Sequence, residues 1–181
     1  PSAIALGVGV VGDRRRRLRV EAIELADMRP NVPRHAVHAH THEEAHLLVL
    51  HRGAYRSSAR GMPEVCHEPV VILNQPGTHH CDCFESLEDA RFLTISLAPA
   101  AWRAIDDALP LPLHARRLSA LALPAAYRAW RALLAADDAA PLDVEAEVHA
   151  LLQRAAGDHD RPCAEAGAAW LVRARQRLDD A

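Results

Sequence analysis

The segment HAHTHEEAHLLVLHRG, residues 38–53, decides the fold class of this chain. Four of its first nine residues are histidines, and an apolar, strand-forming run follows them directly. Side chains two positions apart share one face of an extended strand. His40, His42 and His46 therefore point to the same side if the backbone stays extended, and Leu48 and Leu50 continue that face into a core.

Further strand patterns surround this segment up to about residue 98. Residues 18–25 alternate roughly between apolar and charged side chains, and short apolar runs lie at residues 47–50, 70–73 and 92–97, separated by turn residues. Pro76-Gly77 suits the two central positions of a type II turn, because proline presets φ and glycine supplies a positive φ. We expect the four arginines at residues 14–17 to form a solvated turn. Strands at this spacing predict a β-sandwich or barrel.

The hydrophobic period becomes helical after residue 98. A short helix is predicted from residue 99 to 109, and three longer amphipathic patterns follow it. We therefore predict an α+β chain with a β domain at residues 1–98 and an α-helical tail at residues 99–181. The three apolar stripes are Ala126, Trp130, Leu133 and Leu134; then Val144, Val148, Leu151, Leu152 and Ala155; and finally Leu171, Ala174 and Leu178.

The histidines are concentrated in the β half, where nine of the twelve lie between residues 35 and 80. A barrel that brings the segment of residues 40–46 beside the Pro76-Gly77 turn would converge four imidazoles. Neutral imidazoles suit zinc, iron, nickel or copper, and zinc is our first expectation. The alternative is a polar lining without metal. The predicted ligands are His40, His42, His46 and His80, whereas His35, His38, His51 and His67 are expected at the surface.

Composition narrows the function classes. The net charge is -3, which argues against a nucleic-acid-binding surface in this chain. The apolar run at residues 3–11 is too short to span a bilayer and has no basic leader before it. Cys66, Cys81, Cys83 and Cys163 show no CxxC spacing, so we expect unbridged thiols in the cytoplasm. A thiolate sensor at Cys81 and Cys83 is the alternative.

Two motifs resemble those of the cupin family. His40-Thr-His42, three residues, His46, six residues and Gly53 is similar to the first cupin motif, with histidine where that motif has glutamate. Pro76-Gly77-Thr78-His79-His80 resembles the second motif, with Gly77 and His80 in register and the proline one place closer than usual. The glycine that normally opens the second motif is missing. The resemblance implies a cupin-like barrel with a metal site.

The segments HLLVLHRGAYR, VVILNQPGTHHCDCF and ARFLTISL, followed by the helical tail, resemble the N-terminal sensor half of AraC-family transcription regulators. This resemblance covers roughly residues 15–181. It implies a domain that binds a small-molecule or metal effector, forms a homodimer and contacts DNA only through a C-terminal domain that this chain lacks. Asp82 and Thr94 are the predicted effector contacts, and no enzymatic activity is expected. The alternatives are a small cupin metalloenzyme, either a dioxygenase or an isomerase, and a zinc-cupin anti-sigma factor.

Overall fold

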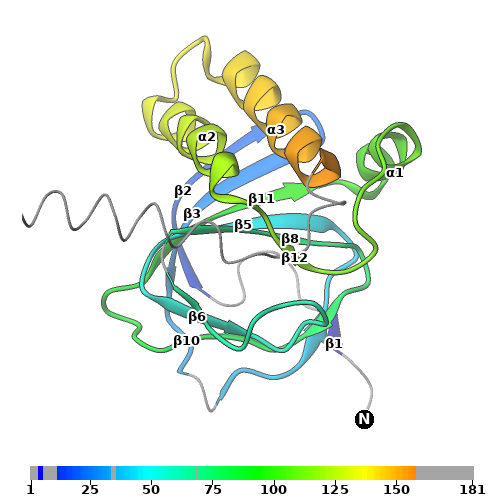
Figure 1. The fold of residues 1–181 in the computed structure, drawn as a ribbon. Coiled ribbons are helices and arrows are strands. Elements are labelled where there is room, and N and C mark those ends of the chain that lie inside the picture. Colours follow the sequence, from blue (N-terminus) through cyan, green and yellow to red (C-terminus); the bar gives the residue numbers. More distant parts are fainter. Residues whose placement is uncertain (1–3, 6–11, 34–35, 68, 158–181) are drawn as a thin grey trace, which may run out of the picture.

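The computed structural model describes residues 4–5, 12–33, 36–67 and 69–157. Its largest sheet contains six strands, and all their pairings are antiparallel. Figure 1 shows this sheet with helices on one side and short strands on the other. In spatial order the six strands are β12 (Arg116–Arg117), β8 (Val70–Asn74), β5 (Ala45–Arg52), β11 (Arg91–Leu97), β3 (Ile23–Pro30) and β2 (Gly12–Val20).

Two smaller sheets complete the β part. One has the order β10 (Asp82–Phe84), β6 (Ala54–Ser57) and β7 (Cys66–His67). The other has the order β1 (Ile4–Ala5), β4 (His40–Thr41) and β9 (His79–His80), and its β1–β4 pair is parallel. The predicted α+β class is therefore confirmed. Within the residues described, however, the strands form three sheets rather than one closed barrel.

An apolar core lies between the six-stranded sheet and the β10–β6–β7 sheet. We call it the inner core. Leu48 and Leu50 of β5 contribute to it, as the alternation along residues 46–50 predicted. Its other buried members are Ala26, Met28, Tyr55, Cys66, Val70, Ile72, Phe84, Ala90 and Phe92.

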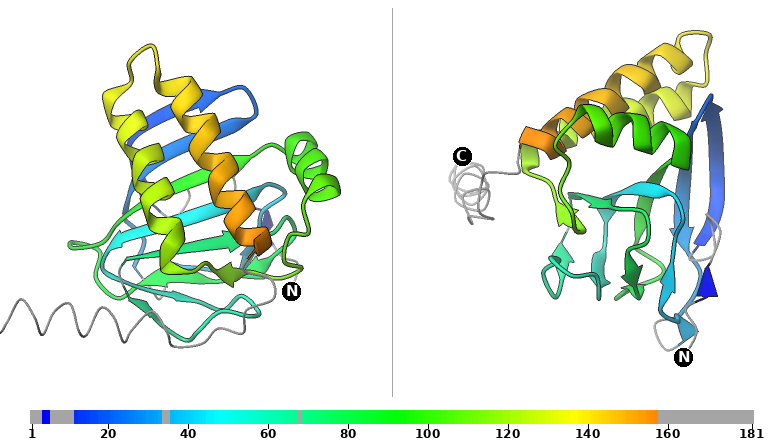
Figure 2. Two further views of the ribbon diagram at one scale, coloured as in Figure 1. Left: turned by 45° about the horizontal axis from the view of Figure 1, so that its top comes forward. Right: turned by 90° about the vertical axis from the view of Figure 1, so that its right-hand side faces the viewer.

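A second core lies on the opposite face of the six-stranded sheet, under the helices. These helices are α1 (Pro99–Ala108), α2 (Leu123–Ala135) and α3 (Ala140–Gly157), and a short 3-10 turn at Ala120–Ala122 precedes α2. The two views of Figure 2 show α2 and α3 side by side across that face, with α1 at its edge. Leu47 and Val49 alternate with Leu48 and Leu50 along β5 and face this outer core.

The first two predicted helix stripes are used inside the chain. Val144, Val148, Leu151, Leu152 and Ala155 of α3 are all at most 1% exposed. Ala126, Trp130 and Leu133 of α2 are also buried, and Leu134 is 38% exposed. β12 lies beyond residue 98 and pairs with β8, so the sheet and the helices share one core. The third stripe, at residues 171–178, falls outside the described residues, as do His35 and Cys163.

The arrangement of residues 12–30 differs from our prediction. The four arginines of residues 14–17 belong to β2 rather than to a turn, and the register shifts between Arg14 and Arg16. The predicted strand at residues 18–25 is divided by a tight turn at Glu21 and Ala22. Glu21 adopts a φ of 47°, which is uncommon for a residue with a side chain. No glycine or asparagine marks this turn, so the hairpin could not be recognised from its turn residues.

Candidate metal centre

Backbone pairing brings two distant histidine segments together. β4 runs antiparallel to β9, and in this ladder His40 lies directly opposite His80. The amide of Gly77 donates a hydrogen bond to the carbonyl oxygen of His42 at 2.9 Å. Residues 40–42 and 77–80 are therefore held side by side before any metal is considered.

The turn before β9 has the predicted geometry. Gly77 has a φ of 77°, as the third position of a type II turn requires. The amide of Thr78 donates to the carbonyl oxygen of Gln75 at 3.1 Å, which closes the turn. This turn sets where β9 begins, and so it positions His80.

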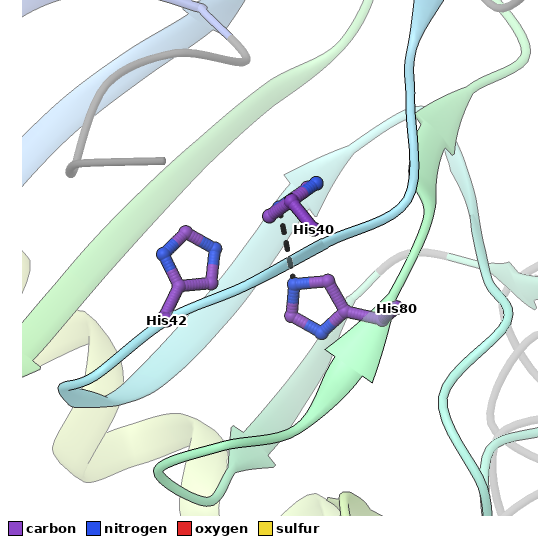
Figure 3. Close-up of side chains that lie close together, drawn as sticks. All are labelled: His40, His42 and His80. Carbon is purple, nitrogen blue, oxygen red and sulfur yellow. Dashed lines mark hydrogen bonds between the residues drawn. The ribbon is translucent and has the colours of Figure 1, made fainter. Parts of the chain in front are cut away.

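Three imidazoles converge at this place, as Figure 3 shows. His40, His42 and His80 each offer one ring nitrogen, and these atoms lie within 4.8 Å of one another. The Nε2 atoms of His40 and His80 are 3.2 Å apart. Two nitrogen ligands of a tetrahedral zinc ion, each at ~2.0–2.1 Å from it, would be separated by about 3.3 Å. The spacing of these two nitrogens therefore already suits a shared metal.

The proton of His40 is fixed on the far side of its ring. Its Nδ1 lies 2.9 Å from the carbonyl oxygen of His38, and a carbonyl oxygen can only accept a hydrogen bond. Nδ1 therefore carries the proton, and the lone pair of Nε2 faces His80. Metal-binding histidines are commonly oriented in this way by a carbonyl partner.

Burial also favours the neutral form of His80. The side chain is fully buried. Burial lowers the pKa of His80 from its ordinary value, although the charge of Asp82 opposes this shift. Neutral imidazole is the form that binds metal. The residues at this site therefore fit a divalent metal ion.

His46 lies beside the cluster but is engaged elsewhere. Its ring centroid is 4.6 Å from that of His42 and 5.7 Å from that of His80. The Nδ2 atom of Asn74, which is opposite His46 in the β5–β8 ladder, donates to His46 Nε2 at 3.0 Å. To bind a metal through Nε2, His46 would have to lose its hydrogen bond from the Asn74 amide. The group of three histidines does not include His46, and its role as a ligand stays a prediction.

The three histidines converge by a route other than the one we expected. Shared parity along a continuous strand was the basis of the prediction, but residues 42–44 lie outside any strand and form a bend. β4 and β5 belong to different sheets. His42 reaches the cluster because the bend lies against the Gly77 turn.

Both predicted effector contacts lie in the interior. Asp82 is 5% exposed, and its Oδ2 is 3.6 Å from His80 Nε2. Thr94 of β11 stands between Leu48 and Ala26 in the sheet, on the inner-core side. Asp82 Oδ1, Thr94 Oγ1 and Asn74 Oδ1 are buried without a hydrogen-bond partner. Our sequence reasoning missed Asn74, although a polar residue that ends an apolar strand is a recognisable signal.

The structure agrees with the predictions for the histidines and cysteines outside the cluster. His38, His51 and His67 are exposed. Cys66 and Cys83 are buried, Cys81 is partly buried, and none of these three forms a disulfide. Among the helices that the structure describes, none has both the length and the apolar character needed to cross a bilayer.

Neither protein-family models nor curated proteins match this chain. Solved structures to which it is similar include a Cupin 2 conserved barrel domain protein from Salinispora arenicola CNS-205. That match has 14% identity and a TM-score of 0.39, and it covers 57% of this chain and 96% of the other. An oxalate decarboxylase matches with 18% identity and a TM-score of 0.37, over 55% of this chain and 32% of its own length. These likenesses concern the fold alone and identify no family or activity for this chain.

One prediction from the sequence needs correction at this point. We expected that the chain is not an enzyme, and this exclusion was wrong. Oxalate decarboxylase is itself an enzyme, so likeness to this fold does not separate binding domains from catalysts. The likeness assigns no reaction to this chain.

Proposed function

We propose that this chain binds one divalent metal ion at His40, His42 and His80 and uses the metal-bound state to recognise a small molecule. One observation carries the proposal. The lone pair of the buried His40 Nε2 faces His80 Nε2 at 3.2 Å, while the His40 proton is held by the His38 carbonyl. A metal ion would satisfy both nitrogens at once.

The donor set favours a borderline metal, and we propose zinc first. Imidazole nitrogens suit zinc, iron, nickel and copper, whereas calcium and magnesium prefer oxygen ligands. Three histidine ligands resemble zinc sites in which a further position stays open to water or substrate. When bound, the metal would act as a Lewis acid toward a ligand in that position.

The small molecule would reach the polar atoms beside the metal. Buried polar groups in proteins are normally hydrogen-bonded. Asp82 Oδ1, Thr94 Oγ1 and Asn74 Oδ1 have no partner, and they come from three strands that face the inner core. We therefore propose that Asp82 and Thr94 contact the effector.

A sensor role is the function that we propose for this binding. β5 contributes Leu48 and Leu50 to the inner core and Leu47 and Val49 to the core under the helices. A ligand that favours one packing of the inner face would therefore also bias the helices, by population shift. In this proposal the helices report to a partner subunit and to a separate DNA-binding domain, as in an AraC-family regulator.

Thermal unfolding with and without metal tests the proposal. Adding zinc to metal-free protein should raise the melting temperature, because a ligand that binds only the folded state stabilises it. His42→Ala should abolish this increase, and His38→Ala, which changes a nearby exposed histidine, should preserve it. An equal response in both variants would contradict the proposed site.

A metalloenzyme of the dioxygenase or isomerase type is the second candidate. The open coordination position that three histidine ligands leave favours it. Incubating metal-loaded protein with a bound effector separates the two candidates. An effector that is recovered unchanged supports sensing, and an effector that is oxidised or isomerised over many turnovers supports catalysis.

A further inference from the structure

We propose that Asp82 is a direct ligand of the metal and supplies the carboxylate that the first histidine motif lacks. The inference rests on the proposed metal binding by His40, His42 and His80. It places the carboxylate on β10, beyond the second histidine motif, and leaves His46 to its partner Asn74. With Asp82 as the fourth ligand, Thr94 remains the effector contact, and an effector would bind the metal as a fifth ligand.

The position of Asp82 relative to His80 is the first argument. Asp82 Oδ2 lies 3.6 Å from His80 Nε2, the same nitrogen that faces His40. Donor atoms on a tetrahedral metal are about 3.3 Å apart when the bonds are ~2.0–2.2 Å long. The two atoms are therefore near the separation of neighbouring ligands. Asp82 lies outside the group within 4.8 Å, so a side-chain rotation must complete its approach to His40 and His42.

The burial of an uncompensated carboxylate is the second argument. Asp82 is 5% exposed, and in the described part of the chain no arginine is paired with it. The sequence contains no lysine. A buried carboxylate is normally paired with a cation or coordinates a metal.

The unpartnered oxygen of Asp82 is the third argument. Its Oδ1 is buried and has no hydrogen-bond partner. A buried carboxylate oxygen normally has a hydrogen-bond donor or a cation as its partner. A divalent cation would supply that partner.

His46 is the other candidate for the fourth ligand, and it is the weaker one because its donor atom already has a hydrogen-bond partner. Its Nε2 already accepts a hydrogen bond from Asn74. Asp82 Oδ1 has no such hydrogen bond to give up. A site of three histidines and one aspartate would combine imidazole nitrogens with one carboxylate oxygen. The carboxylate would come from Asp82 on β10 and not from the position that His46 occupies in the first motif.

Metal titration of the full chain tests the inference, with Zn²⁺ and Co²⁺ as probes. Zn²⁺ affinity is measured by competition with a chromophoric chelator, and the visible spectrum of the Co²⁺ form reports the ligand set. The variants are Asp82→Asn and His46→Gln, with Asp27→Asn as a matched control, because Asp27 is a buried aspartate outside the site. Asp82→Asn should weaken Zn²⁺ binding by more than about 100-fold, beyond the effect of losing an outer hydrogen-bond partner, and should change the Co²⁺ spectrum. His46→Gln and Asp27→Asn should change neither.

Metal-free protein gives a second readout. Asp82→Asn should raise the melting temperature of the metal-free chain, because it removes a buried charge without a partner. A variant that folds and is more stable, yet binds metal poorly, supports the inference. A weaker affinity with an unchanged Co²⁺ spectrum would overturn it, because Asp82 would then act from outside the coordination sphere. Loss of binding in His46→Gln with normal binding in Asp82→Asn would also overturn it. If the unmodified chain binds neither ion, the proposed function itself fails.

Discussion

Protonation of single histidines decides when this site is ready for a metal. Each ring can bind a metal only through a nitrogen that has no proton. His40 achieves this through the carbonyl of His38, and His80 through burial. His46 is also kept neutral, because burial and then the charges of His42 and His80 lower its pKa well below the ordinary value. The neutral forms of His46 and His80 are therefore built into the folded state.

The metal-free protein should lose stability as the pH falls below about 6.5, the ordinary histidine value. There an unfolded His46 binds a proton that the folded chain excludes, so acid favours unfolding. The free energy of unfolding should decrease by up to about 1.4 kcal/mol per pH unit for each such histidine, until the pH reaches the lowered pKa. Urea unfolding with EDTA at several pH values measures this slope. His46→Gln should reduce it, and an unchanged slope would contradict the assignment.

Gly53, which follows β5, should be more sensitive to substitution than Gly77. Both have a positive φ, at 98° and 77°. A Cβ on Gly53 would lie 2.9 Å from the Cβ of Ala90, whereas a Cβ on Gly77 would meet no atom within 4 Å. Gly77→Ala should cost about 1–2 kcal/mol from backbone strain alone. Gly53→Ala should cost at least about 1 kcal/mol more through overpacking. Urea unfolding of both variants compares them, and equal losses would rule out the close contact.

At the scale of elements, one arginine of the sheet, Arg91, also contacts a helix. Arg91 of β11 donates to both carboxylate oxygens of Asp27 on β3, at 3.1 and 2.8 Å. Its guanidinium also lies over the ring of Trp130 on α2, 5.2 Å from the centroid. Asp27 is almost fully buried, whereas the side chain of Arg91 is 35% exposed. Arg91 thus links two strands and a helix.

Removing Arg91 should destabilise the chain through the carboxylate that it leaves behind. Arg91→Ala should lower the free energy of unfolding by about 2–3 kcal/mol, because Asp27 becomes a buried charge without a partner. The double variant Arg91→Ala with Asp27→Asn should recover part of that loss. Chemical denaturation measures both, and a loss below about 0.5 kcal/mol in Arg91→Ala would contradict this account.

The sequence predicted those elements whose signals are local. The Pro76-Gly77 turn and helix α1 lie where expected, because proline, glycine and the apolar period specify them directly. The hairpin at Glu21 and Ala22 could not be predicted, since its turn residues carry no glycine or asparagine. The contact of Asn74 with His46 was also hidden, because it depends on the register between β5 and β8. Convergence of His40 and His80 was predicted from strand parity and an assumed barrel, whereas in the structure the pairing of β4 with β9 produces it.

At the scale of the whole molecule, the predicted homodimer needs a surface other than the buried parts of the apolar stripes of α2 and α3. Those parts are packed inside the chain. Leu142 at the start of α3 is 72% exposed, and Leu134 near the end of α2 is 38% exposed. Both lie close in sequence to the α2–α3 loop. We propose that this end of the helix pair contacts a second copy.

Light scattering at micromolar concentration tests that interface. The unmodified chain should have the mass of a dimer, and Leu142→Glu should shift it toward the monomer because a charge would be buried in the contact. Asp138→Asn, in the neighbouring loop, should leave the mass unchanged. A monomer that persists at all concentrations, with and without zinc, would rule out the dimer.

The metal content of protein purified without nickel-affinity chromatography tests the central claim most directly. Elemental analysis by mass spectrometry, on protein purified by ion exchange and loaded with a mixture of divalent metals, counts the ions per chain. We predict about one tightly held ion per unmodified chain and little or none in His42→Ala, at equal purity and folding. An unmodified chain that retains no metal after this loading, or a His42→Ala variant that retains as much as the unmodified chain, would contradict the account.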